Sequence, residues 1–177
     1  MSDFMNLCLK RQTCRDFADK PVEHDKLVSC VEAARLAPSG CNAQPWSFVV
    51  VEKPELVAQV AECAQQLGAN AYAAGARAFV VVVEERATLM PGIACIVHSQ
   101  YFAQGDLGAA GAYLCLEAEA QGLATCQFGI FDRPKLAKLL DIPGEKPIVS
   151  LFAVGYARDT KVRPKQRKPL DAIARFL

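Results

Sequence analysis

Apolar residues recur along the chain at two spacings, one typical of helices and one typical of strands. Helical spacing covers residues 3–10, 24–37, 54–67, 101–121 and 134–140, and short apolar runs cover residues 46–51, 78–83, 125–131 and 148–155. The run AFVVVV at 78–83 is typical of a strand buried on both faces. Gly122 is expected to end the fourth of these helices as its C-cap. Segment 90–99 fits either state, since Pro91-Gly92 interrupts it.

The order of these elements indicates the fold class. Two helices precede the first strand, and one helix precedes each later strand, which is not a regular βαβ series. The pattern therefore predicts an α+β fold with helices layered on a sheet. Residues 1–177 are expected to form a single domain, because a chain of this length buries about 70% of its extended surface. Residues 158–177 are expected to form an extended basic arm with a short terminal helix.

Charge is nearly balanced overall but unevenly distributed. Residues 1–157 carry 13 basic and 17 acidic side chains, whereas residues 158–177 carry seven and two. A net charge of +1 excludes a nucleic-acid binder that acts through overall basicity, and the basic arm indicates contact with an anion. No apolar run approaches the roughly 18 residues of a membrane span, and the first residues lack a secretory pattern. We therefore expect a cytoplasmic protein without a membrane partner.

The eight cysteines do not have the spacing of a metal site. They contain no C-x-x-C pair, and the chain has only two histidines, so neither a structural metal nor a disulfide framework is expected. Cys14, Cys41 and Cys126 lie within the motifs described next. A thiol that senses redox state and a small space-filling side chain are the two interpretations.

Two basic segments are candidates for anion binding. In the first, RQTCR at 11–15, two guanidiniums flank the Thr13 hydroxyl, although a solvated basic turn paired with nearby aspartates explains the same pattern. In the second, an extended backbone would point Lys165 and Arg167 the same way, so that they could hold one phosphate. A disordered basic tail is the alternative for this segment.

A polar loop, PSGCNAQPW at 38–46, separates a predicted helix from a predicted strand. Two prolines and a glycine restrict it, and Ser39, Asn42 and Gln44 offer donors and acceptors suited to a planar heterocycle or a ribityl chain. An Asx turn that links the two elements is the alternative interpretation.

In this order and spacing the three segments resemble the FMN-dependent nitroreductase family, also called the NAD(P)H oxidase/nitroreductase fold. The family start Arg-x-Ser/Thr-x-Arg/Lys-x-Phe is RQTCRDF here, and the family loop Ala-Pro-Ser-Ser/Gly-x-Asn-x-Gln-Pro-Trp is APSGCNAQPW. GLATC and a GY followed by KQR match the later motifs. The resemblance spans nearly the whole chain. It implies a three-layer fold with a central, mostly antiparallel sheet flanked by helices, and a C-terminal arm that extends onto a partner subunit.

The same resemblance implies a tightly bound FMN at the interface of a homodimer. The phosphate of FMN is expected to contact Arg11, Lys165 and Arg167, and the ribityl chain and pyrimidine edge are expected to contact Gln12, Thr13 and Arg15. The flavin ring would lie beside Gln127, Phe128 and Gly129. The loop residues Pro38, Ser39, Gly40 and Asn42 would come from the other subunit. Arg15 is the candidate for stabilising the reduced flavin, and no side chain is expected to act as acid, base or nucleophile. Asn70 is a candidate match for an asparagine that contacts the flavin in larger members.

The implied activity is that of an oxidoreductase. FMN would pass a hydride from NAD(P)H to a nitroaromatic, a quinone or a similar small acceptor by a ping-pong mechanism. The alternative is an FMN-binding module for storage, delivery or redox sensing with little turnover. Larger members carry a helical excursion where this chain has only residues 85–101, so the range of acceptors stays open.

Overall fold

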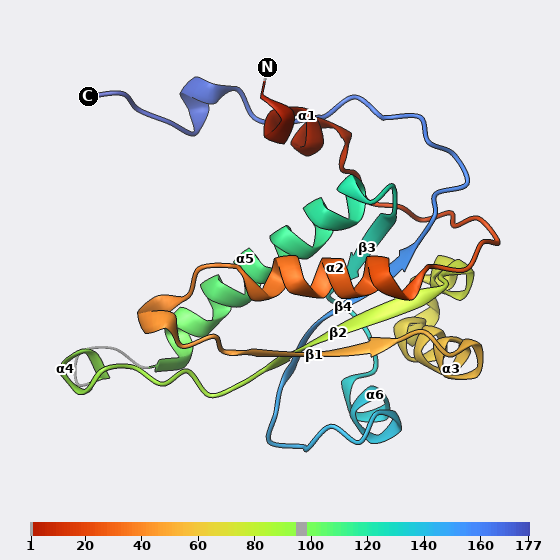
Figure 1. Ribbon diagram of the computed structural model, residues 1–177, viewed down its shortest axis with the longest axis horizontal. Helices are drawn as coiled ribbons and strands as arrows, with labels where there is room; N and C mark the ends of the chain where they lie inside the picture. Colours follow the sequence, from red (N-terminus) through yellow and green to blue (C-terminus); the bar gives the residue numbers. More distant parts are fainter. Residues whose placement is uncertain (1, 95–98) are drawn as a thin grey trace.

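The computed structural model describes residues 2–94 and 99–177 and contains a four-stranded sheet with helices on both faces (Figure 1). The strands, in the spatial order β1-β2-β4-β3, are β1 (Trp46–Val51), β2 (Ala78–Glu84), β3 (Ala124–Phe128) and β4 (Ile148–Gly155). Every pair of neighbouring strands is antiparallel. An isolated parallel bridge joins Thr13 to Thr125 at the β3 edge.

The described part of the chain contains six α-helices. They are α1 (Asp3–Lys10), α2 (His24–Arg35), α3 (Pro54–Ala64), α4 (Pro91–Ala94), α5 (Ser99–Ala120) and α6 (Arg133–Leu139). Helices α2 and α5 pack on one face, and α3 and α6 on the other. The predicted α+β fold with a central antiparallel sheet is therefore confirmed. In the described part of the chain, no helix has both the length and the apolar character needed to cross a membrane.

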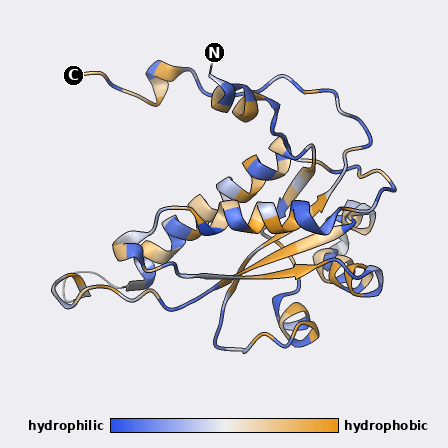
Figure 2. Ribbon diagram, in the orientation of Figure 1, coloured by the Kyte–Doolittle hydropathy of each residue, from blue (hydrophilic) through white to orange (hydrophobic). Residues whose placement is uncertain are grey.

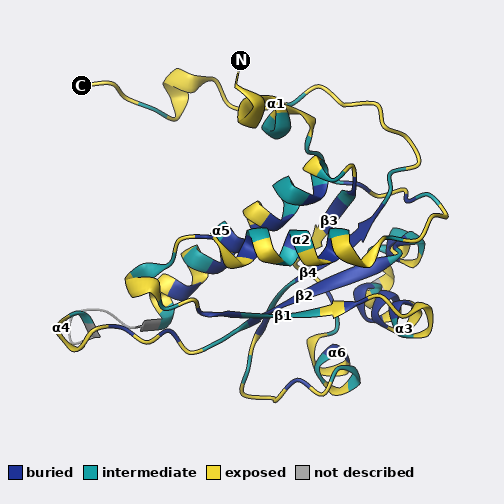
Figure 3. Cartoon of the chain, in the orientation of Figure 1, coloured by how far each residue is buried: buried dark blue, intermediate teal, exposed yellow. Residues whose placement is uncertain are grey.

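Strand β2 shows why the sheet is covered on both faces. Its residues alternate between two cores: Val80 and Val82 pack with α2 and α5, whereas Phe79, Val81 and Val83 pack with α3 and α6. The strands are accordingly the most hydrophobic part of the ribbon (Figure 2) and among the most deeply buried (Figure 3). The interpretation of the valine run as a strand buried on both faces is confirmed.

Most predicted elements are present, and the differences lie at their ends. Helix α3 ends at Ala64 rather than residue 67, because the chain turns into a 3₁₀ helix, Gln66–Gly68, whose glycine has φ +74°. Strand β3 ends at Phe128 rather than residue 131, since the chain then turns toward α6. Segment 90–99 contains α4 and the start of α5, and residues 95–98 lie outside the described part.

The predicted terminal helix is wrong. The arm contains only one 3₁₀ turn, Leu170–Ala172, and its residues are largely exposed (Figure 3). Three residues give too few hydrogen bonds for a stable isolated helix, and no core cluster includes residues of this turn.

Glycines allow two close contacts that hold the sheet to its neighbours. A Cβ on Gly155 would lie 2.8 Å from Cδ1 of Phe17, and one on Gly111 would lie 3.0 Å from Cζ of Phe152. Phe17, only 2% exposed, thereby fixes the N-terminal segment against the end of β4. The glycine in α5 lets that helix approach β4 closely.

Candidate functional site

The N-terminal motif runs alongside the edge strand β3. Thr13 bridges Thr125, and the N–H of Cys14 donates to the Thr125 carbonyl at 2.9 Å. In this extended segment Cys14 points into the core, whereas Arg15 is exposed. Residues 11–15 and the end of β3 are therefore brought side by side.

The C-terminal arm docks onto the same segment through Gln12. The Gln12 Nε2 donates to the Lys161 carbonyl at 2.9 Å, and its Oε1 accepts from both N and Nε of Arg163 at 3.1 Å. Arg163 Nη2 also donates to the Thr13 carbonyl. The expected flavin contact of Gln12 therefore stays a prediction, because both ends of its amide already bond to the arm.

Three cations expected at the phosphate come together here. Lys165 Nζ donates to the Arg11 carbonyl, and Arg11 and Arg167 are both close enough to act on its charge. Partial burial, together with these like charges, lowers the pKa of Lys165 from its usual value. Among the described residues none of the three makes an ion pair. The cluster therefore has the charge that a phosphate would neutralise.

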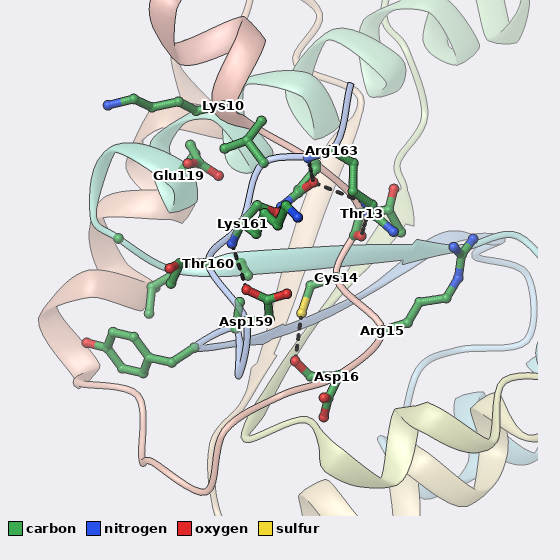
Figure 4. A pocket seen from close by; sticks show the side chains of 17 residues that line it. Lys10, Thr13, Cys14, Arg15, Asp16, Glu119, Asp159, Thr160, Lys161 and Arg163 are labelled. Atoms are coloured by element: carbon green, nitrogen blue, oxygen red, sulfur yellow. Dashed lines mark hydrogen bonds between the residues drawn. The ribbon is translucent and has the colours of Figure 1, made fainter. Parts of the chain in front are cut away.

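A cavity of about 440 Å³ lies beside the docked arm (Figure 4). Its walls come from Lys10 and residues 12–16, from Glu119 and the turn between α5 and β3, and from residues 156, 157 and 159–163. In Figure 4 Arg163 and Lys161 extend toward Thr13, whereas Arg15 extends away from the arm. Arg15 thus faces away from the hydrogen bonds that hold the arm to residues 11–13.

Tyr72 lies between Arg15 and the end of β3. Its ring is stacked on Phe128 with centroids 5.8 Å apart, and the Arg15 guanidinium carbon lies 5.7 Å from its centroid. Its hydroxyl donates to Asn70 Oδ1 at 2.8 Å. Sequence reasoning missed Tyr72 and Arg163, because neither lies in a motif and their contacts appear only in the folded chain.

The Asn70 side chain holds two segments of the main chain together in this structure. It has φ +58°, and its Nδ2 donates to the carbonyls of Ala64 at 3.1 Å and Ile130 at 3.0 Å. These bonds hold the end of α3 to the turn after β3. Its amide is therefore occupied by main-chain groups, and its match to a flavin-contacting asparagine stays a prediction.

The residues expected beside the ring have separate environments at the end of β3. Gln127 is exposed and donates to Ser150 Oγ at 3.0 Å, and Phe128 is buried against Tyr72. Gly129 is exposed, and its carbonyl accepts from Arg133 Nη2 at 3.0 Å. The three thus form the edge next to Arg15.

The polar loop lies elsewhere. The N–H of Gly40 donates to Asp106 Oδ2 at 3.0 Å, which fixes the loop at the N-terminal half of α5, whereas the cation cluster acts on Glu119 near the C-terminal end. At about 1.5 Å per residue, Asp106 and Glu119 are about 20 Å apart along the helix. Within one chain the structure does not bring Pro38, Ser39, Gly40 and Asn42 to Arg11.

The loop itself is tightly folded. Asn42 and Gln44 have φ of +53° and +48°, and Ser39 Oγ accepts from the Gln44 N–H at 3.0 Å. A Cβ on Gly40 would meet Phe102 at 3.3 Å. This backbone presents a fixed set of polar groups at its end of α5.

The cysteines of the motifs differ in environment. Burial raises the pKa of the Cys14 and Cys126 thiols, which favours the space-filling interpretation, whereas Cys41 is exposed. Among the described residues, no three His, Cys, Asp or Glu side chains are grouped as metal ligands.

Comparison with known proteins identifies the family of this chain. The nitroreductase family model matches residues 8–156. An iodotyrosine deiodinase of Thermotoga neapolitana is 28% identical, covering 98% of this chain and 96% of its own, and an NADH dehydrogenase of Thermus thermophilus is 25% identical over 97% and 94%. The structure of an FMN-dependent nitroreductase from Clostridium difficile has a TM-score of 0.80 at 21% identity, covering 97% of this chain and 98% of its own. The chain belongs to the nitroreductase family of oxidoreductases.

Proposed function

We propose that this protein is an FMN-dependent oxidoreductase in which bound FMN passes a hydride from NAD(P)H to a small acceptor, such as a nitroaromatic or a quinone, in ping-pong turnover. The cation cluster is the observation that carries this proposal. Arg11, Lys165 and Arg167 come from the two ends of the chain, and among described residues none is neutralised by an ion pair. Such a cluster suits the phosphate of FMN.

The remaining groups would hold the rest of the cofactor. Arg15, placed over Tyr72, offers a positive charge to the pyrimidine edge of a ring that lies along the end of β3. A fixed cation there would favour the electron-rich form of the ring. Gln127 to Gly129 would form the wall beside it. No proton donor or nucleophile from the chain is required, since the residues orient the cofactor and supply charge.

We further propose that a second copy of the chain completes the site. The loop at 38–44 is polar and rigid but lies about 20 Å along α5 from the cations, so it would serve the site of a partner subunit. The outer surface of α5 supports this arrangement, because Gly105 and Gly108 face open space and Ala112 and Tyr113 are exposed. The arm would extend onto the same partner.

Flavin binding is the first test. The purified chain should show the absorption of bound flavin or acquire it when FMN is added, and failure of both would overturn the proposal. Anaerobic mixing with NADH and with NADPH should then bleach the flavin absorption. FMN binding without reduction by either nicotinamide would instead support a storage, delivery or sensing module.

An acceptor panel then identifies the reaction. Nitroaromatics and quinones should reoxidise the reduced protein in a second, separate half-reaction. Iodotyrosine belongs in the panel, because relatives that are named iodotyrosine deiodinase match this chain over nearly its whole length. Release of iodide, with no turnover of nitroaromatics or quinones, would favour reductive dehalogenation.

A further inference from the structure

The arm that carries two of the three phosphate candidates is held to the body of the protein by few contacts. Residues 161–168 are exposed apart from Lys165, and no core cluster includes them. The bonds that fix this stretch to residues 11–13 come from Gln12, Arg163 and Lys165. The position of Lys165 and Arg167 therefore depends on these three side chains.

Gln12 is suited to recognise the arm. Its amide donates to one arm residue through Nε2 and accepts from another through Oε1, so it bonds the backbone of the arm at both Lys161 and Arg163. The Gln12 amide thus bonds backbone groups of the arm in the way that a neighbouring strand would. These bonds fix how far the arm is shifted along residues 11–13, and this position decides which arm residues face Arg11.

Arg163 has a different use from the cations beside it. Its guanidinium donates to Gln12 Oε1 and to the Thr13 carbonyl, so its donors are directed at the N-terminal motif. Lys165, two residues further along, reaches the Arg11 carbonyl. Arg163 therefore places its neighbours rather than serving as a phosphate ligand.

Docking of the arm has an electrostatic cost. It brings Lys165, which already has Arg163 and Arg167 beside it in the arm, close to Arg11, with Glu119 as the opposing charge. Like charges at this range repel one another, and an anion bound among them removes that repulsion. Any anion that binds only the docked arrangement must stabilise it by mass action.

We propose that Gln12 and Arg163 form a clasp that docks residues 161–167 onto residues 11–13, and that docking of this arm and binding of a phosphate group at Arg11, Lys165 and Arg167 stabilise each other. Gln12 and Arg163 are positioning residues in this arrangement. The identification of the phosphate with that of FMN rests on the proposed function. The coupling itself concerns any phosphate at the cluster.

Trypsin cleavage of the full chain reads out arm docking without a flavin. Within residues 159–170 trypsin can cut after Lys161, Lys165 and Arg167, whereas Arg163 and Lys168 precede proline and resist cleavage. Inorganic phosphate should slow these cuts in the unmodified protein. Gln12→Ala and Arg163→Ala should speed them by about fivefold, because cleavage follows the open population when a hydrogen bond is lost.

Matched controls separate the clasp from general effects. Gln59→Ala removes an exposed glutamine that bonds its own helix, and Arg35→Ala removes an exposed arginine paired with Glu32. Neither should change cleavage of the arm. Arg163→Lys keeps the charge but loses the forked geometry, so it should behave like Arg163→Ala. Cleavage of Arg163→Lys at the unmodified rate would mean that charge alone holds the arm.

Comparison of FMN with riboflavin connects the clasp to the cofactor. Gln12→Ala and Arg163→Ala should weaken FMN binding by up to about fivefold, the factor by which they weaken docking of the arm, and should leave riboflavin binding unchanged, because riboflavin lacks the phosphate. Equal losses for both flavins would overturn the positioning role. Cleavage that ignores phosphate in the unmodified protein would overturn the coupling. If neither flavin binds the unmodified protein, the proposed function fails, and trypsin with inorganic phosphate still decides the clasp.

Discussion

Tyr72 connects Arg15, on the N-terminal motif, with Phe128 at the end of β3. Its ring lies under the Arg15 guanidinium and against Phe128, and its hydroxyl bonds to Asn70. An aromatic ring at this distance attracts a cation with about 0.5–1 kcal/mol at an exposed position. Tyr72 therefore orients a charge that would otherwise sample several rotamers.

Replacement of Tyr72 should alter the flavin through Arg15. Tyr72→Leu removes the ring and should make the reduction potential of bound FMN more negative, because a less ordered cation stabilises the reduced ring less. Tyr72→Phe keeps the ring but removes the hydroxyl that bonds to Asn70 and interacts with Arg15, so it should shift the potential less than Tyr72→Leu does. Equilibration with a reference dye measures both, and equal shifts would count against the role of the ring.

At the scale of residues, the sequence predicts some of the neighbours seen in the folded chain and not others. The motifs placed Arg11, Lys165 and Arg167 in one group, and the structure brings them together from the two ends of the chain. The flavin contact expected of Gln12 stays a prediction, and the structure adds that its amide bonds Lys161 and Arg163. A contact between residues about 150 positions apart has no local sequence signal, which is why the clasp was not predictable.

At the scale of elements, close packing at the end of β4 fixes the N-terminal motif. Phe17 is buried against Gly155, where a Cβ would lie 2.8 Å from its ring, and Ala18 and Arg158 continue the contact through backbone bonds to Tyr156 and Asp16. Gly155 is required because a side chain there would collide with Phe17, and not because its φ is unusual. The motif is thus held on one side by packing against the end of β4 and on the other side by the arm.

Gly155→Ala should therefore destabilise the protein. The added methyl group must displace a buried ring, and overpacking of this kind costs about 1–3 kcal/mol of unfolding free energy. Gly144→Ala is the control, since a Cβ there meets nothing within 4 Å. Urea unfolding measures both variants, and an unchanged midpoint for Gly155→Ala would show that Phe17 can move aside.

The elements themselves were largely predictable because their patterns are strong. Strands β1 and β4 have the predicted bounds, and α1 begins and ends at the predicted residues. Gly122, with φ +73°, ends α5 as expected, since the N–H of Leu123 bonds the Ala118 carbonyl. The prediction of a terminal helix was wrong because a short exposed segment with helical spacing has no partner to pack against.

At the scale of the whole molecule, the exposed surface of α5 is the best candidate for a subunit contact. Gly105, Gly108 and Ala112 leave little side chain there, so another helix could approach its backbone closely. Exposed tyrosines at 101 and 113 flank these positions. Small residues that pack against nothing within their own chain fit an obligate partner better than a solvated face.

Ala112→Arg should disrupt that contact. A long charged side chain on this face would separate the two copies, so the variant should elute as a monomer and bind FMN more weakly than the unmodified protein. Ala58→Arg, on the exposed side of α3, makes the same change away from the proposed contact. Light scattering after size-exclusion chromatography gives both masses, and a dimer that survives Ala112→Arg would contradict the assignment.

The separation of the cation cluster and the polar loop along α5 has a genetic consequence. In the proposed dimer each site takes its cations from one chain and its loop from the other. A mixed dimer of one sound chain and one chain defective in either half would always keep one complete site. Two different defective alleles, one in each half, would likewise restore one site when their products assemble together. Only an allele damaged in both halves would silence both sites of its partner.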